Sequence, residues 1–334
     1  MRGTWGMGFE VIKPGLLSTL QDEGRYGYRK YGVITSGPMD FFAHRAANVL
    51  VGNTANTAVL EMTLLGPILV AHEDMLLALC GAEMEADVDG IRVPLWRPFL
   101  IRKGEKLSVH YAIKGCRAYL AVCGGFEVKS VMGSKSTYLR AGIGGHEGRA
   151  LQAGDHVAVS QTGMDTRVKG SIPHSGSVSA FIRPGYKDNP VVRVVRGKEV
   201  SLFTEASRRS FFAQYFLVTP QSDRMGYRLQ GKKLELSKGI PHEIISEAVV
   251  QGTIQVPPSG QPILLMADCQ TTGGYPRIAH IITADLPLVA QVKPGGTLRF
   301  REVSHREAQE QLLLQAMDLR LLEAGVRAWV RDHG

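Results

Sequence analysis

The stretch LLALCGAEMEADVDGIRV, residues 76–93, decides which kind of fold this chain forms. Its first five residues are an apolar run of the length of a buried strand. Further on, Asp89-Gly90 stands between two short apolar segments and favours a tight turn between antiparallel strands. Comparable runs separated by turns continue from about residue 59 to 159, the clearest being Phe99–Ile101 and Ala118–Val122. This spacing predicts a mainly antiparallel sheet or barrel and not alternating βαβ units.

The second half of the chain resembles the first in the same order. Residues 193–197, 224–228, 252–256 and 293–298 are similar to residues 10–13, 25–29, 66–70 and 102–107. Similarity at an offset of roughly 185–200 residues indicates two copies of one β unit. We therefore predict a first β-barrel domain at 9–160, a polar linker at 161–189 and a second β-barrel domain at 190–302.

Two helices are predicted beside these strands. Apolar residues recur at helical spacing from Phe41 to Leu50, directly after Asp40, which suits the positive N-terminal end of a helix. Near the end of the chain, Ser304 and Glu307 have the spacing of a capping box and open a C-terminal helix at 303–331. We expect this helix to pack on the barrels, with binding of a partner as the alternative.

Composition excludes several classes of protein. The 334 residues carry 39 Lys and Arg against 31 Asp and Glu, and this scattered surplus of +8 forms no basic run of the kind that binds nucleic acid. It fits an anionic substrate or an acidic partner. The ten histidines show no H-E-x-x-H spacing, so no metal site is expected. No C-x-x-C pair, signal peptide or membrane span is recognised, which favours a reduced, cytoplasmic location.

A polar stretch, Asp268–Arg277, follows the apolar run at 263–267. It brings a carboxylate, an amide, two hydroxyls, two glycines, a tyrosine and an arginine together at the end of a buried strand. One interpretation is an ordinary polar turn. We favour the other, the rim of a small-molecule pocket, because donors, acceptors and a cation converge within ten residues. Cys269 within it is expected to be a buried thiol and not a nucleophile.

Glycines and arginines mark two further loops. Residues 142–154 contain five glycines, but Glu147 stands where a dinucleotide fingerprint needs its third glycine, so a structural loop is the simple interpretation. Arg149 in that loop could still hold an anion. Other arginines lie next to glycine or tyrosine in loops, where a guanidinium can bind a carboxylate or phosphate through two parallel hydrogen bonds.

Several of these motifs together resemble one family. They are residues 22–25, 37–40, 144–149, 224–228, 255–257 and 270–276. The family is KipA, also called allophanate hydrolase subunit 2 or the C subunit of 5-oxoprolinase, and it is related to the carboxyltransferase domain of urea carboxylase. The resemblance runs from about residue 9 to residue 302.

The resemblance implies two related cyclophilin-like β-barrel domains, with a few short helices, in a cytoplasmic bacterial protein. It implies an ATP-dependent 5-oxoprolinase that is active only with a KipI-like B subunit and a LamB/YcsF-type A subunit. ATP with Mg²⁺ would be a co-substrate, and no tightly bound cofactor is expected. Two alternatives stay open: a regulatory protein that sequesters a KipI-like kinase inhibitor, and a component of a carboxyltransferase or of an allophanate-hydrolase-like enzyme.

Site residues follow from this resemblance and from the polar stretch. Asp268 and Asp40 are the candidate proton carriers. The candidate substrate-binding residues are Arg224, Tyr227, Arg228, Gln270, Thr271, Thr272, Gly273, Gly274, Tyr275 and Arg277. The candidate nucleotide-binding residues are Arg25, Arg29 and Arg149.

Overall fold

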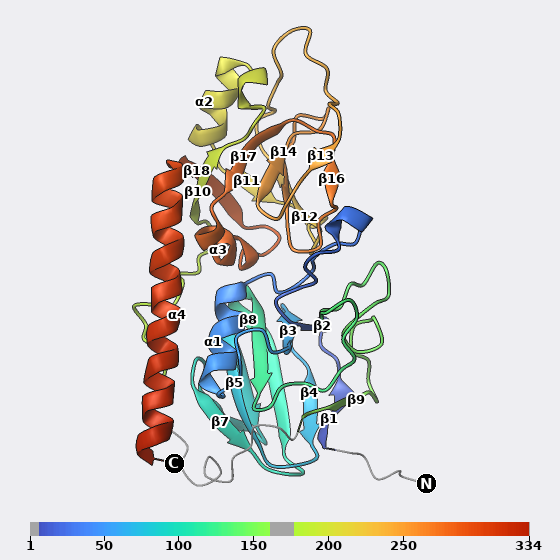
Figure 1. The fold of residues 1–334 in the computed structure, drawn as a ribbon, viewed down its shortest axis with the longest axis vertical. Helices are drawn as coiled ribbons and strands as arrows, with labels where there is room; N and C mark the ends of the chain where they lie inside the picture. Colours follow the sequence, from blue (N-terminus) through green and yellow to red (C-terminus); the bar gives the residue numbers. More distant parts are fainter. Residues whose placement is uncertain (1–6, 161–176, 334) are drawn as a thin grey trace. The chain divides into compact units, whose positions relative to one another are not determined.

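The computed structural model describes residues 7–160 and 177–333, and its backbone divides into two compact units (Figure 1). Unit 1 comprises Met1–Arg25, Ser36–Pro184 and Ala316–Gly334, and unit 2 comprises Tyr26–Thr35 and Gly185–Gln315. Most of the predicted linker and the start of the chain lie outside the described residues, so the predicted domain boundaries stay a prediction. Each unit is described here by itself.

Unit 1 is built on a nine-stranded sheet in the order β2-β3-β8-β4-β1-β9, with β5 paired to β6, β7 and β8. Its strands are β1 (Gly8–Lys13), β2 (Leu17–Gln21), β3 (Val59–Thr63), β4 (Ile68–Ala71), β5 (Met75–Val88), β6 (Ile91–Arg92), β7 (Pro98–Ile101), β8 (Lys106–Val122) and β9 (His156–Ala158). Phe9, Leu77 and Leu120 are fully buried in its core. Their burial follows from the alternation of side chains along each strand.

The turn predicted from Asp89-Gly90 is confirmed. Val88 pairs with Ile91, and the two turn residues have φ values of 49° and 85°. Positive φ at both central residues is the geometry of the type I′ turn that joins twisted antiparallel strands.

The first predicted helix is also confirmed, as α1 (Phe41–Leu50). Asp40 is its N-cap, because its side chain accepts a hydrogen bond from the amide of Ala43 at 3.0 Å. The apolar face of α1 packs on β5 and β8. Asp40 is fully buried, and within unit 1 its carboxylate caps the N-terminus of α1.

Unit 2 is a closed barrel in the order β10-β17-β14-β15-β12-β11-β18, which a parallel pairing of β10 with β18 completes. Its strands are β10 (Val191–Arg196), β11 (Phe216–Val218), β12 (Gly226–Gln230), β14 (Thr253–Gln255), β15 (Ile263–Leu265), β17 (Arg277–Ile281) and β18 (Thr297–Glu302). A separate two-stranded ribbon joins β13 (Glu247–Ala248) to β16 (Thr272–Gly273). Short helices complete the unit: η1 (Arg29–Tyr31), η2 (Val200–Leu202), α2 (Glu205–Ala213), η3 (Thr283–Asp285) and α3 (Leu286–Ala290).

The C-terminal helix α4 (His305–His333) is present as expected, and Figure 1 shows it as one long rod. Ser304 accepts a hydrogen bond from the amide of Glu307 at 3.1 Å, which is half of the predicted capping box. The Glu307 carboxylate instead pairs with Arg301. Leu319 is buried, whereas Leu312 and Leu313 are exposed, so the predicted apolar stripe is only partly covered.

The fold class is therefore confirmed: the described chain is mainly β, with a barrel, a curved sheet and a few helices. The repeat is less regular than predicted. Residues 10–13 and 193–197 both fall largely on strands, but 224–228 enters a strand whereas 25–29 is a loop leading into η1. Within the described ranges, no helix is both long and apolar enough to cross a membrane.

Candidate functional site

The polar stretch, residues 268–277, connects the end of β15 to the start of β17 along the unit 2 barrel, and we call it the polar rim. It leaves β15, passes through β16 and ends at the start of β17. Thr272 pairs with Ala248, and the Thr271 carbonyl accepts a hydrogen bond from the amide of Val249 at 3.1 Å. The two glycines therefore lie in a ribbon held by backbone hydrogen bonds, which gives the rim a fixed position on the barrel.

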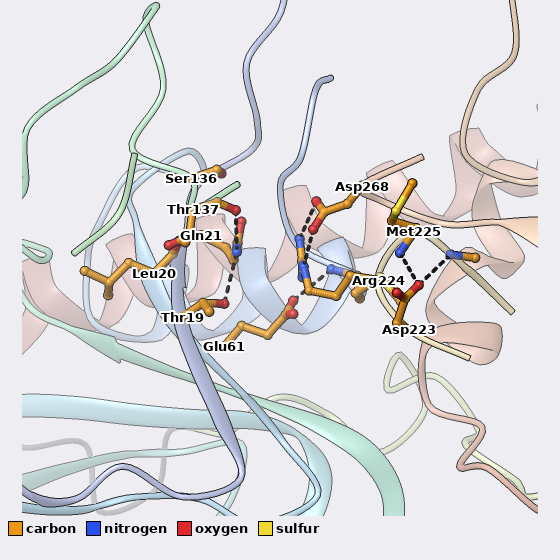
Figure 2. Close-up of polar contacts among 12 residues, drawn as sticks. Thr19, Leu20, Gln21, Glu61, Ser136, Thr137, Asp223, Arg224, Met225 and Asp268 are labelled. Carbon is orange, nitrogen blue, oxygen red and sulfur yellow. Dashed lines mark hydrogen bonds and ion pairs between the residues drawn. The ribbon is translucent and has the colours of Figure 1, made fainter. Parts of the chain in front are cut away.

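Asp268 and Arg224 form a buried ion pair beneath the rim. Arg224 Nε and Nη2 donate to the two carboxylate oxygens at 2.9 and 3.1 Å, and both residues are 4% exposed (Figure 2). The amide of Asp268 also donates to the Arg224 carbonyl at 2.8 Å. Removing one partner of such a pair leaves a buried charge uncompensated. The geometry therefore gives both residues a structural task that the sequence did not reveal.

Arg277 is also engaged by carboxylates of its own chain. Its guanidinium donates to Glu199 at 2.5 and 2.7 Å and to Glu247 at 2.6 Å, and Lys198 donates to Glu247 as well. The hydrogen bonds to Glu199 raise the pKa of Arg277, and those from Lys198 and Arg277 lower the pKa of Glu247 to about 2. Two cations and two anions balance here, so Arg277 clamps the ribbon to β17.

Four rim side chains keep their hydrogen-bonding groups available. The Gln270 amide and the hydroxyls of Thr271, Thr272 and Tyr275 make no hydrogen bond to any residue in the part of the chain that the structure describes. Thr272 is exposed and the other three are half-buried. They are the donors and acceptors that the rim offers to a small polar ligand.

Gln255, which the sequence did not single out as a site residue, supports the rim from β14. Its side-chain amide donates to the Tyr275 carbonyl at 3.3 Å. A Cβ on Gly273 would come within 2.5 Å of the same amide. Because Gly273 has no side chain, the Gln255 amide fits beside it. In the sequence, Gln255 could have been recognised from its place in the motif at 255–257.

Arg29 brings a positive charge to the rim from the segment Tyr26–Thr35 of unit 2. Its guanidinium donates to the carbonyls of Val249 and Thr271. No carboxylate lies within ion-pair distance of it among the described residues. Burial raises the pKa of the nearby Cys269 thiol to about 11, against a smaller opposing effect of Arg29. Cys269 is a buried, neutral thiol, as expected.

Two other predicted residues are not at the rim. Tyr227 is buried in the barrel, and its hydroxyl donates to the Ala290 carbonyl at 3.4 Å. Arg228 is exposed on the outer face of β12, where it pairs with Ile263. Arg224 lies in the bend that precedes β12, whereas Arg228 is the third residue of that strand. The structure therefore brings Arg224, but not Arg228, to Asp268.

The remaining predicted residues belong to unit 1. Arg25 is fully buried and donates to the carbonyls of Val131 and Ser136 at 3.0 and 2.9 Å. Arg149 donates two hydrogen bonds to the Asp155 carboxylate, at 2.7 and 2.8 Å, and also forms an ion pair with Glu147. These contacts hold the glycine-dense loop together. Nucleotide binding by Arg25, Arg29 and Arg149 stays a prediction.

Asp22 shows how closely this part of unit 1 is bound together. Its carboxylate accepts hydrogen bonds from the hydroxyls of Ser134 and Ser136 and from the amide of Lys135, each at 2.6 Å. Burial raises the pKa of Asp22, but these hydrogen bonds outweigh it and the net pKa is lowered. In a second contact of the same region, Gln21 donates to Thr19 at 3.0 Å (Figure 2).

Across residues 7–160 and 177–333, no three His, Cys, Asp or Glu side chains gather as metal ligands.

Several known proteins match this chain over most of its length. A family model described as carboxyltransferase domain, subdomain A and B, matches residues 31–302. The C subunit of 5-oxoprolinase from Haemophilus influenzae is 42% identical over 87% of this chain and 90% of its own length. That of Escherichia coli is 40% identical over 90% of this chain and 92% of its own length.

A solved structure extends the comparison to the fold. The urea amidolyase of K. lactis matches 95% of this chain with a TM-score of 0.88 at 28% identity. The matched part is only 20% of that longer protein. The architecture described above therefore also occurs as one portion of a larger chain.

Proposed function

Because the chain belongs to the family of the carboxyltransferase domain, subdomain A and B, we propose that it acts as the C subunit of a 5-oxoprolinase. The observation that carries the proposal is the identity of 40–42% to two proteins of that name, over about nine tenths of each. The same name implies further subunits. We infer that these are a KipI-like B subunit and a LamB/YcsF-type A subunit, and that the complex is cytoplasmic and bacterial, where the four free, buried cysteines would stay reduced.

The reaction opens the lactam of 5-oxoproline to glutamate. An amide carbonyl is a poor electrophile, and transfer of the γ-phosphoryl group of ATP to its oxygen would make the carbon reactive. One water then adds to this carbon, and the ring C–N bond breaks with the nitrogen taking a proton. A second water cleaves the resulting acyl phosphate to the carboxylate and phosphate. One 5-oxoproline, one ATP and two waters give glutamate, ADP and phosphate. The chain's part in this reaction is to hold and orient the lactam.

The polar rim supplies groups of the right kind. The Gln270 amide and the Thr271 and Thr272 hydroxyls can bond the lactam N–H and C=O, since each is available at the rim. Arg29 is the rim cation whose charge is not balanced by a carboxylate of the described chain, so it suits the substrate carboxylate. Arg224 and Arg277 instead hold the rim in place through Asp268, Glu199 and Glu247.

The test is to purify the chain with its partner subunits and to measure phosphate released on addition of 5-oxoproline and MgATP. Thr272→Ala and Gln270→Ala should each lower turnover about tenfold, because one hydrogen bond to the reacting amide is worth roughly 1–2 kcal/mol. Gln152→Ala, an exposed change in unit 1, is the matched control and should keep full activity. Unchanged turnover in both rim variants would show that the polar rim does not bind the substrate. No 5-oxoproline-dependent phosphate release by the complete complex would remove the function.

The second candidate is a carboxyltransferase role, which the family description and the urea amidolyase structure favour. The 334 residues contain no Met-Lys-Met biotin-attachment sequence, so a carrier would have to come from elsewhere. Transfer of labelled carboxylate from carboxybiotin would support this candidate over the first. Sequestering a KipI-like kinase inhibitor is compatible with the 5-oxoprolinase candidate, because both require docking on the same partner.

A further inference from the structure

A hollow lies on unit 2, and its lining residues are distinct from those of the polar rim. It has a volume of about 350 Å³, which is at the lower end of the range for small-molecule sites. Its walls are the turn after β11, the outer face of β12 and the loop before β15. The lining residues are Thr219, Gln221, Arg228, Leu229, Gln230, Pro257, Ser259, Gln261, Pro262 and Ile263, and none belongs to the rim.

The backbone around the hollow is held by its own hydrogen bonds. The amide of Ser222 donates to the Thr219 carbonyl at 3.1 Å and closes one turn. The amide of Gly260 donates to the Pro257 carbonyl at 2.9 Å and closes another. Gln261 bonds both the amide and the carbonyl of Gly231, at 2.8 and 3.0 Å. The shape is therefore largely set before any ligand arrives, which lowers the entropic cost of binding.

The charge in the hollow is uncompensated. Arg228 is the charged residue among those lining it, and no carboxylate in the described chain lies within ion-pair distance of its guanidinium. The neighbouring acid, Asp223, is turned to the amides of Met225 and Gly226 at 2.8 and 3.2 Å (Figure 2). A planar cation in a concave wall, without an acid of its own, suits the two oxygens of an anion.

Thr219 gives a second, independent indication. Its hydroxyl oxygen is buried, yet it makes no hydrogen bond to any described residue. Buried polar atoms in folded proteins almost always have a partner, so rotation of the Thr219 side chain toward the hollow would give this unpaired group one. The side-chain amides of Gln221 and Gln230 are exposed beside it and add neutral donors and acceptors.

We propose that this hollow binds a small oxyanion, a carboxylate or phosphate group on a molecule of about amino-acid size. The anion takes two hydrogen bonds from Arg228, and the Thr219 hydroxyl rotates out of its buried position to meet a polar group of the same ligand. None of the residues that line the site belongs to the polar rim, so we assign it an occupant other than the reacting amide. The inference is independent of the proposed function.

The test is a titration of the ¹⁵N-labelled full chain, followed by the amide signals of Thr219, Leu229 and Ile263. L-glutamate and inorganic phosphate are the two probes, and they separate a carboxylate ligand from a phosphate ligand. We expect one of them to shift these signals saturably at concentrations on the order of 1 mM. Arg228→Gln should weaken that binding at least tenfold, and Thr219→Val should weaken it several-fold.

The control is Arg140→Gln, which removes an exposed arginine of unit 1 and should leave the titration unchanged. The hydrogen bonds to Arg228 and Thr219 that hold the fold run through the backbone, so both hollow variants should keep the wild-type spectrum elsewhere. If neither probe shifts the hollow signals, or if Arg228→Gln binds as well as the wild type, the proposal is overturned.

Discussion

At the scale of single residues, most of the arginines at the candidate sites serve the chain itself. Arg277 meets Glu199, which is 78 residues away in sequence, and Arg224 meets Asp268, which is 44 residues away. Sequence shows that an arginine lies in a loop, but not which carboxylate the fold brings to it. The motif was therefore sufficient to place the rim. Arg29, which has no carboxylate partner among the described residues, was assigned to the rim only from its contacts.

Asp268 can be tested for a structural against a catalytic role. Asp268→Asn should lower the free energy of unfolding by about 3–5 kcal/mol, because it leaves the buried Arg224 guanidinium without its carboxylate. Urea unfolding followed by circular dichroism measures this loss. Asp223→Asn, which changes an exposed acid one residue from Arg224, is the control and should cost about 1 kcal/mol or less. A stable Asp268→Asn protein without turnover would instead assign Asp268 to the chemistry.

At the scale of elements, the long hairpin of unit 1 shows how far strand prediction reached. The apolar runs at 76–80 and 118–122 were recognised, but the strands extend over Met75–Val88 and Lys106–Val122. Gly81 directly follows the first of these runs. Its φ of 105° marks a bend within the strand, beyond which exposed Glu83 and Glu85 alternate with buried Met84 and Ala86. The change from a run buried on both faces to alternation hid the second half of the strand.

Gly81 should therefore be intolerant of a side chain. A Cβ at this position would lie 2.5 Å from the Arg117 carbonyl oxygen on β8, in addition to the strain of positive φ. Gly81→Ala should lower the free energy of unfolding by roughly 2–4 kcal/mol in a denaturant titration. Gly325→Ala is the opposite case, since it lies in α4 with open space around it, and it should stabilise by up to about 1 kcal/mol. Equal effects of the two changes would contradict this explanation of the bend.

At the scale of the whole molecule, neither unit is formed by one continuous stretch of sequence. Sequence patterns predicted contiguous domains, and the repeat gave a reason for two. They gave no sign that Tyr26–Thr35 belongs to unit 2 while the residues on both sides of it belong to unit 1. Such membership depends on contacts distant in sequence, such as that of Arg29 with Thr271, and a local pattern does not encode them.

The segment Tyr26–Thr35 should determine how stably the polar rim is held. Arg29 donates to the carbonyls of Val249 and Thr271 from the two sides of the ribbon, so Arg29→Gln removes charged hydrogen bonds worth about 1.5–3 kcal/mol each. Amide hydrogen exchange at Val249 and Ile244, whose N–H groups bond across to the rim, should become at least tenfold faster. Exchange in β14 and β17 of the barrel should not change. Lys30→Gln, the neighbouring exposed cation, is the control, and unaltered exchange at Val249 in Arg29→Gln would show that the rim is stable without this segment.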